Sequence, residues 1–286
     1  MQKHISIHMS GRLGNQLFQW AFAHQVAKKY GRKVQLIYDS IHEHRGYESN
    51  LSSLEFSCSH VLHGRRNETA GYFLSGLDKI TAKSKKLGSL ISSKLRILRA
   101  GDHDEILVLP AVAPNLITGF FINWKTVEGI ENLLADELKN ALEKIDLPVK
   151  IENRYQVLHV RRGDFTNLKE SFGVLTSEYY VNHLDKLLPA FICTDDEFLV
   201  PEIKSATKAI SVFGPSELNP IQTLKVMSQA SLVVMSNSTL SWWGGFLCEK
   251  QGGKVLLPTP FYKYLDDYAT TLQKPGFIPV RSIFEN

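Results

Sequence analysis

The residues best suited to chemistry lie between His159 and Asp164, in the sequence HVRRGD. They end an apolar stretch that begins at Tyr155 and predicts a buried strand. Ligands of open α/β sheets bind at the carboxyl ends of the strands, and arginine forks suit phosphate oxygens at any working pH. The run therefore predicts a site for a phosphorylated ligand. A surface Arg-Asp pair, the alternative, would contribute only about 0–1 kcal/mol.

A second polar run, Ser236 to Thr239 (SNST), separates an apolar stretch from a helical one. Hydroxyls and free backbone N–H groups would then gather at the positive end of a helix dipole, which favours an anion. Simple N-capping explains the same sequence, although four small polar residues exceed what one cap needs. We favour the anion site.

Two further motifs are less specific. The segment from Gly11 to Gln16 (GRLGNQ) lacks the Lys-Ser/Thr of a P-loop and does not fit G-x-G-x-x-G, so it supports neither an ATPase nor a dehydrogenase. The two glycines fit two interpretations equally well: a backbone that approaches a ligand closely, or a tight turn. The motif Thr194-Asp195-Asp196 follows a strand and fits a ribose or base contact, a helix N-cap or, less well, a metal. Adjacent Trp242 and Trp243 face different sides of a predicted helix, so we expect core packing for both.

These motifs follow strands in a regular alternation of strands and helices. The alternation predicts parallel sheets covered by helices, in two Rossmann-type halves whose intervening cleft is the default binding site. We expect domains at residues 1–149 and 150–286. The predicted strands are 4–9, 34–38, 155–160, 190–193, 210–213, 232–235 and 254–257, and the predicted helices are 16–30 (ended by Gly31), 132–145, 177–188, one starting at Pro220 behind the cap Asn219, and 240–250.

The region from about residue 40 to 120 is the least legible and the most basic. Between His60 and Gly101 the sequence has nine Lys/Arg and two acidic residues, whereas the whole chain has a net charge of only +4. The mild overall charge does not indicate nucleic acid. The basic segment 83–99, in which Ile91, Leu95 and Leu98 fit one helix face, indicates a solvated surface or peripheral attraction to an anionic membrane.

The cysteines and the absence of long apolar runs indicate a cytoplasmic protein. The three cysteines are odd in number, widely spaced and without a CxxC pair, which favours a reduced compartment. The N-terminus resembles no signal peptide, and no apolar run reaches the ~18 residues that span a bilayer. At most, we expect a peripheral position at the inner membrane face.

Taken together, the motifs GRLGNQLFQ (11–19), HVRRGD (159–164), TDD (194–196) and SNSTLSWW (236–243) resemble those of the α-1,2-fucosyltransferases of glycosyltransferase family 11, in the same order. The resemblance implies a GT-B-like fold and GDP-β-L-fucose as donor, with no cofactor and no metal requirement. It implies inverting transfer of fucose to the 2-hydroxyl of a terminal β-galactoside, in glycan or lipopolysaccharide O-antigen biosynthesis. Another nucleotide sugar, or a non-catalytic nucleotide or glycan binder, are the alternatives.

The resemblance also implies roles for individual residues. Arg161 is expected at the β-phosphate and His159 at the nucleoside end. From the residues themselves, we expect Arg162 to brace the loop, and Asp164, the only carboxylate of the arginine loop, to act as the base or to orient an arginine. Acceptor contacts are expected from the N-terminal half, including Trp124, which sits at a predicted strand end as an exposed aromatic, and the loop 41–50. The remaining donor-binding residues are expected to be Gly11, Gly14, Asn15, Asp195, Asp196, Asn237, Ser238 and Thr239.

Overall fold

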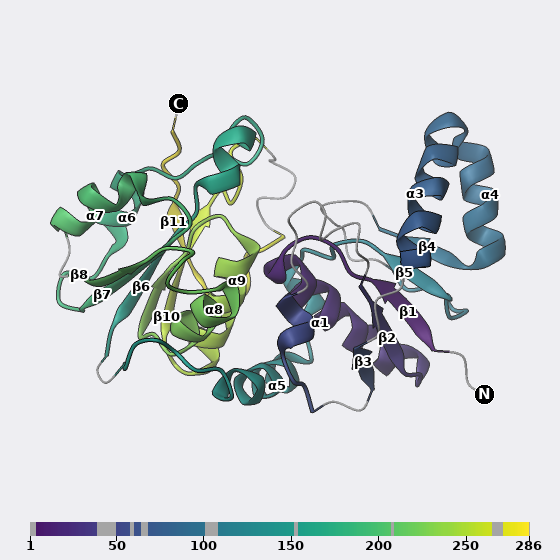
Figure 1. The fold of residues 1–286 in the computed structure, drawn as a ribbon, viewed down its shortest axis with the longest axis horizontal. Helices are drawn as coiled ribbons and strands as arrows, with labels where there is room; N and C mark the ends of the chain where they lie inside the picture. Colours follow the sequence, from purple (N-terminus) through teal and green to yellow (C-terminus); the bar gives the residue numbers. More distant parts are fainter. Residues whose placement is uncertain are drawn as a thin grey trace. The chain divides into compact units, whose positions relative to one another are not determined.

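The chain forms two compact units, Met1–Glu137 and Leu138–Asn286 (Figure 1). The division falls within helix α5 (Glu131–Glu143), and the expected boundary after residue 149 stays a prediction. Each unit contains a sheet of parallel strands with helices, which confirms the predicted α/β class. The computed structural model describes residues 4–38, 50–57, 60–63, 68–100, 108–151, 154–206, 209–264 and 271–285.

The sheet of the first unit has the strand order β3-β2-β1-β5-β4. Ile7 on β1 lies opposite Leu36 on β2 and Ile117 on β5, and these three fully buried side chains form a hydrophobic row across the sheet. The strands are β1 (Ile5–His8), β2 (Val34–Ile37), β3 (Val61–His63), β4 (Ile97–Arg99) and β5 (Leu116–Thr118).

The helices of the first unit confirm some predictions and correct others. Helix α1 begins at Leu13, earlier than predicted, and ends as expected at Gly31, which has φ 60° and donates its N–H to the Ala27 carbonyl. The predicted single face of Ile91, Leu95 and Leu98 was wrong, because the helix ends before Leu98, which lies in β4. The described helical segments are α1 (Leu13–Tyr30), η1 (Asn50–Ser53), α3 (Glu68–Lys83), α4 (Lys85–Leu95), η2 (Trp124–Thr126) and α5.

The sheet of the second unit has the order β11-β10-β9-β6-β7-β8. This is the doubly wound order 3-2-1-4-5-6, in which the chain reverses its direction of progress between β6 and β9. The predicted series of strands ended one too early, since β11 pairs in parallel with β10. The strands are β6 (Gln156–Val160), β7 (Ala190–Thr194), β8 (Ala209–Phe213), β9 (Leu232–Val234), β10 (Lys254–Thr259) and β11 (Ile278–Arg281).

Local hydrogen bonds set the ends of the helices in this unit. Helix α8 has the expected cap, because the side-chain Oδ1 of Asn219 accepts from the N–H groups of Ile221 and Gln222. The side-chain Oε1 of Gln222 in turn accepts from the Asn219 N–H. Helix α6 ends well before the predicted residue 188, since the Gln156 side chain binds the backbone of Asp185 and Leu188 in a non-helical segment. The helical segments are η3 (Gly163–Leu168), α6 (Ser177–His183), η4 (Glu197–Leu199), α7 (Val200–Ala206), α8 (Pro220–Ser228) and α9 (Thr239–Lys250).

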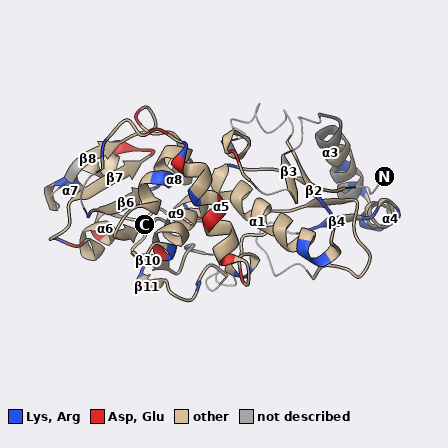
Figure 2. Cartoon of the chain, turned by 90° about the horizontal axis from the view of Figure 1, so that it is seen from below, with Lys and Arg blue, Asp and Glu red and all other residues tan. Residues whose placement is uncertain are grey.

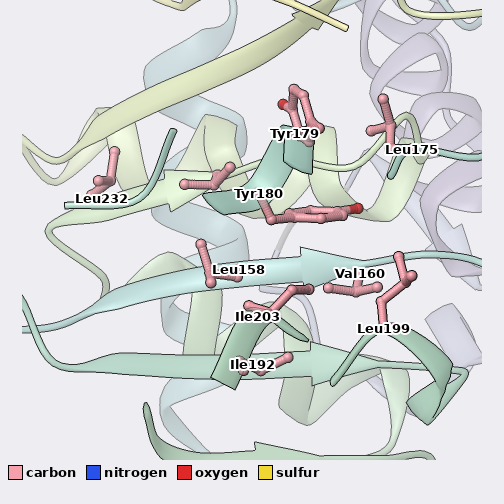
Figure 3. Packing of buried hydrophobic residues seen from close by; sticks show 10 residues of the cluster. Leu158, Val160, Leu175, Tyr179, Tyr180, Ile192, Leu199, Ile203 and Leu232 are labelled. Carbon is pink, nitrogen blue, oxygen red and sulfur yellow. The ribbon is translucent and has the colours of Figure 1, made fainter. Parts of the chain in front are cut away.

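The core of the second unit packs α6 and α7 against β6 and β7 (Figure 3). The ring of Tyr180 lies over β6, and its hydroxyl points toward the Val160 end of that strand (Figure 3). Trp242 and Trp243 on α9 are fully buried, which confirms their predicted core role. Within the described residues, no helix is both long and apolar enough to cross a bilayer.

Candidate active site

The arginine run and the SNST turn come together at the switch point of the second sheet. Because β6 and β9 are neighbours in parallel register, the segments that follow them leave the same edge of the sheet. His159 on β6 and Ser236 after β9 meet there, with His159 Nδ1 and Ser236 Oγ 3.1 Å apart. The Ser236 N–H also donates to Ser241 Oγ on α9 at 3.0 Å. One hydrogen-bonded chain thus joins the arginine loop to the start of α9.

His159 is a neutral member of this cluster. Burial, together with a smaller contribution from the positive charge of Arg161, lowers the pKa of His159 from 6.5 to about 3. Near neutral pH the imidazole is therefore uncharged and contributes hydrogen bonding, so the positive charge of the loop comes from its arginines.

Asp195, at the end of β7, organises the backbone of the arginine loop. Its Oδ1 accepts from the Arg162 N–H at 2.8 Å and the Gly163 N–H at 3.2 Å, while its Oδ2 pairs with Arg161 Nη1 at 2.7 Å. A Cβ atom at Gly163 would lie 2.5 Å from that Oδ2, so the glycine in the HVRRGD motif permits the close approach. A carboxylate that satisfies three donors fixes the loop tightly.

Arg161 is held by two carboxylates and remains partly open to solvent. Besides Asp195, its guanidinium binds Asp164 Oδ1 at 2.5 Å, and it lies 5.6 Å from the centre of the Phe165 ring. The side chain of Asp164 is 39% exposed and that of Arg161 is 17% exposed. The pair therefore stands at the surface of the loop, where Arg161 can meet an anion.

Arg162 is the more deeply buried arginine and braces the loop, as expected. Its guanidinium pairs with Asp196 and with Glu285, and it stacks on Phe198 at 4.6 Å. Asp196 also caps η4 by accepting from the Phe198 N–H at 2.9 Å, which confirms the N-cap alternative for the TDD motif. Its expected contact with a nucleoside stays a prediction, as does that of Asp195.

In the SNST turn, some side chains are buried and hold the turn in place, whereas others are partly exposed at the start of α9. The buried amide of Asn237 donates to the carbonyls of Phe172 and Gly173, both at 3.0 Å, and so ties the turn to the segment before α6. Ser238 is the N-cap of α9 and accepts from the Leu240 N–H, which confirms the capping alternative. Thr239 opens the helix and is only half-buried. Donor contacts by these three residues remain predictions.

The glycine turn of the first unit contains Arg12 at the N-cap of α1 and is held by two glutamine side chains. Gly11 has φ +73°, and a Cβ atom there would lie 2.6 Å from the Asn15 side chain. The side chain of Gln16 donates to the Gly11 carbonyl, and that of Gln19 donates to the Gly119 carbonyl. Gly14 and Asn15 lie in the first turn of α1, not in the turn where they were predicted. Their expected donor contacts are untested.

Trp124 occupies a different setting from the one predicted. It begins η2, which Asn123 caps, and it is half-buried. The prediction of an exposed aromatic at a strand end was wrong, because β5 ends at Thr118 and the chain turns before Trp124. Residues 41–49 of the other expected acceptor segment lie outside the described residues.

Two contributors to the site were not foreseen. Glu285 follows Arg162 by 123 positions, so no local spacing pointed to it. It belongs to a segment in which Phe284 pairs with Leu175 and the Lys263 side chain binds the Glu285 carbonyl. Tyr180 is the second. Burial raises its pKa and Asp195 adds to the rise, so the hydroxyl stays protonated below the loop. No motif in the sequence pointed to Tyr180.

Solved structures identify the fold class. Fucosyltransferase NodZ from Bradyrhizobium matches with a TM-score of 0.51 and 11% identity, over 86% of this chain and 94% of that chain. A structure of NodZ α-1,6-fucosyltransferase soaked with GDP-fucose matches with a TM-score of 0.51 and 10% identity, over 86% and 93%. The likeness confirms the predicted GT-B-like architecture of two parallel-sheet units.

The sequence identifies the family. The model of Glycosyl transferase family 11 matches residues 4–273. An alpha-1,2-colitosyltransferase of Escherichia coli is 24% identical over 283 residues, which cover 89% of this chain and 91% of that protein. The chain therefore belongs to glycosyl transferase family 11, the α-1,2-fucosyltransferase family, and is a glycosyltransferase.

Proposed function

We propose that this protein transfers L-fucose from GDP-β-L-fucose to the 2-hydroxyl of a terminal β-galactoside, with inversion, in glycan or O-antigen biosynthesis. The observation that carries the proposal is the contact between His159 and Ser236, which joins the arginine loop to the start of α9 at the switch point of a doubly wound sheet. Such switch points bind nucleotides. Membership of the family supports the donor sugar and the linkage.

The diphosphate of the donor is assigned to Arg161 and to the N-terminus of α9. Arg161 provides a fixed positive charge, and the first turn of α9 provides backbone N–H groups at the positive end of its dipole. Asp195 holds Arg161 and the loop backbone in the orientation that presents this charge. His159 is neutral, which suits a hydrogen-bonding role toward the nucleoside end.

The reaction needs one bond to form as another breaks. The acceptor oxygen bonds to C1 of fucose while the bond from C1 to the β-phosphate oxygen breaks, and the electron pair leaves with GDP. The acceptor proton passes to a base. Negative charge grows on the leaving diphosphate, and Arg161 opposes it; removing one such donor typically costs about 10²–10³ in rate.

The role of Asp164 follows from its partner. Asp164 Oδ1 lies 2.5 Å from Arg161 Nη2, so the carboxylate is already engaged by the guanidinium and the geometry favours orientation of Arg161 over proton removal. The two roles differ in their pH profiles. If Asp164 orients Arg161, Asp164→Asn lowers kcat by a similar factor at every pH. If Asp164 is the base, the variant loses the acidic limb of the profile.

The donor assignment is tested with a panel of nucleotide sugars. With a β-galactoside acceptor, GDP-fucose should turn over far faster than GDP-mannose or UDP-galactose, and NMR of the product should show an α-1,2 linkage. Full activity in excess chelator is also expected. Turnover of another donor in preference to GDP-fucose, or a different linkage, would overturn the proposal.

A second candidate donor is activated colitose, because the E. coli relative is a colitosyltransferase. Colitose is fucose without its 3-hydroxyl. A site that hydrogen-bonds this hydroxyl would reject colitose strongly, whereas a site that leaves it free would accept both sugars. Direct competition between the two donors in one reaction decides between them.

A further inference from the structure

Helix α4 presents apolar side chains to solvent on one face. Leu87 is 49% exposed and Leu90 is 52% exposed. The helix packs against its hairpin partner α3 and against β4, and its buried residue, Gly88, lies on the other side of the helix from Leu90. The two leucines are thus left uncovered by the described residues of their own unit.

Basic side chains flank these leucines. Exposed Lys86 and Lys94 share the face of Leu90, because positions 86, 90 and 94 recur at the four-residue spacing of a helix. Figure 2 shows Lys and Arg in blue on α4. In the sequence from Lys79 to Arg99 there are seven Lys/Arg and no acidic residue. The face therefore combines half-exposed leucines with positively charged lysines.

This combination selects one kind of partner. Lysine is depleted from the centres of protein–protein interfaces, so the flanking lysines argue against a second copy as the occupant. A dissolved polyanion would engage the lysines and leave the leucines in water. An anionic bilayer surface satisfies both, since the head groups attract lysines and the boundary of the acyl chains accepts leucines.

We propose that α4 docks this protein on anionic lipid, with Leu87 and Leu90 entering the interface and Lys86 and Lys94 contacting head groups. The proposal does not depend on the donor site. It requires no spanning segment, because a short amphipathic helix lies in the plane of the interface.

Vesicle co-sedimentation of the full chain tests the proposal. Phosphatidylcholine vesicles containing phosphatidylglycerol should bind the protein, and vesicles of phosphatidylcholine alone should not. Replacing both lysines, Lys86→Glu with Lys94→Glu, should weaken binding by about 25-fold or more, since each lysine near such a surface is worth about fivefold. The matched control Lys139→Glu with Lys204→Glu makes the same change of net charge at exposed positions of α5 and α7 and should bind nearly as wild type.

The leucines are tested separately. Leu87→Ser with Leu90→Ser should lower binding at low salt and remove what binding remains at high salt, because salt screens the lysines and not the apolar contact. Circular dichroism and thermal melting check that the variants fold. The proposal would be overturned if the two lysine double variants lost vesicle binding equally. It would also be overturned if high salt alone abolished binding of the wild type, or if the protein did not bind anionic vesicles. A dimer that the leucine variant dissociates would overturn it too, because that result would assign the face to a second copy.

Discussion

The turns after β1 and after β6 are held in place by different kinds of side-chain interaction. Each leaves an interior strand of a parallel sheet. The turn after β1 is fastened by the neutral amides of Gln16 and Gln19, whereas the loop after β6 is fastened by ion pairs of Arg161 and Arg162. Ion-paired arginines thus characterise the loop after β6, to which we assign the diphosphate of the donor. The first unit supplies a rigid polar turn.

The largest effect on stability is expected at Arg162. Because Arg162→Ala leaves Asp196 and Glu285 without their shared cation, it should lower the free energy of unfolding by about 3 kcal/mol. Urea unfolding measures this. The control is Arg154→Ala, an exposed position, which should change stability by no more than about 0.5 kcal/mol. Equal effects of the two variants would mean that the brace is not energetically important.

The next largest effect on stability is expected from substituting a glycine that has a close neighbour, in comparison with a glycine that has none. Gly163→Ala places a Cβ atom against the Asp195 carboxylate and should destabilise the protein by about 1–2 kcal/mol. Gly76→Ala makes the same chemical change in helix α3, where nothing lies within 4 Å, and should stabilise the protein by up to about 1 kcal/mol. Thermal melting compares the two. The same sign for both would contradict the close packing of the arginine loop on Asp195.

A pH-dependent effect is expected from His159. Its pKa is about 3 when folded and 6.5 when unfolded, so the unfolded state binds the proton first. The neutral imidazole therefore contributes stability above pH 6.5, and this contribution declines as pH falls toward 3. Between pH 6.5 and 5.5 the loss should be about 1 kcal/mol. Urea unfolding across this range should show it in the wild type, and His159→Gln should flatten the curve by that amount. If the free energy of unfolding fell equally with pH in the wild type and in the variant, the loss of stability in acid would come from groups other than His159.

The smallest effect concerns the first unit. If Trp124 contacts the acceptor, Trp124→Ala should raise the KM for a β-galactoside by about tenfold, which corresponds to the loss of one aromatic contact. The KM for the donor should stay unchanged. Trp124→Phe, which keeps an aromatic ring, is the matched control. A change in the KM for the donor instead would indicate that Trp124 contacts the donor and not the acceptor.

Features set by neighbouring residues could be predicted from the sequence. Asn219 before Pro220 fixed the start of α8, and the apolar stretches fixed most strands of the second unit, because capping and burial act over a few residues. The contact of His159 with Ser236 was not predicted, because it depends on β6 and β9 being neighbours in the sheet.

Features set by distant contacts could not be predicted. Glu285 reaches Arg162 across more than a hundred residues, and Gln156 ends α6 through contacts about thirty residues away. In α6, these tertiary hydrogen bonds override local helix propensity.

The central claim is that Arg161 binds the donor's diphosphate. Calorimetric titration with GDP, together with the rate of transfer from GDP-fucose, tests this most directly in Arg161→Ala, with thermal melting to show that the variant is folded. The account predicts that GDP binds at least tenfold more weakly and that transfer falls by about 10²–10³. A folded variant that binds GDP and transfers fucose as the wild type does would contradict it.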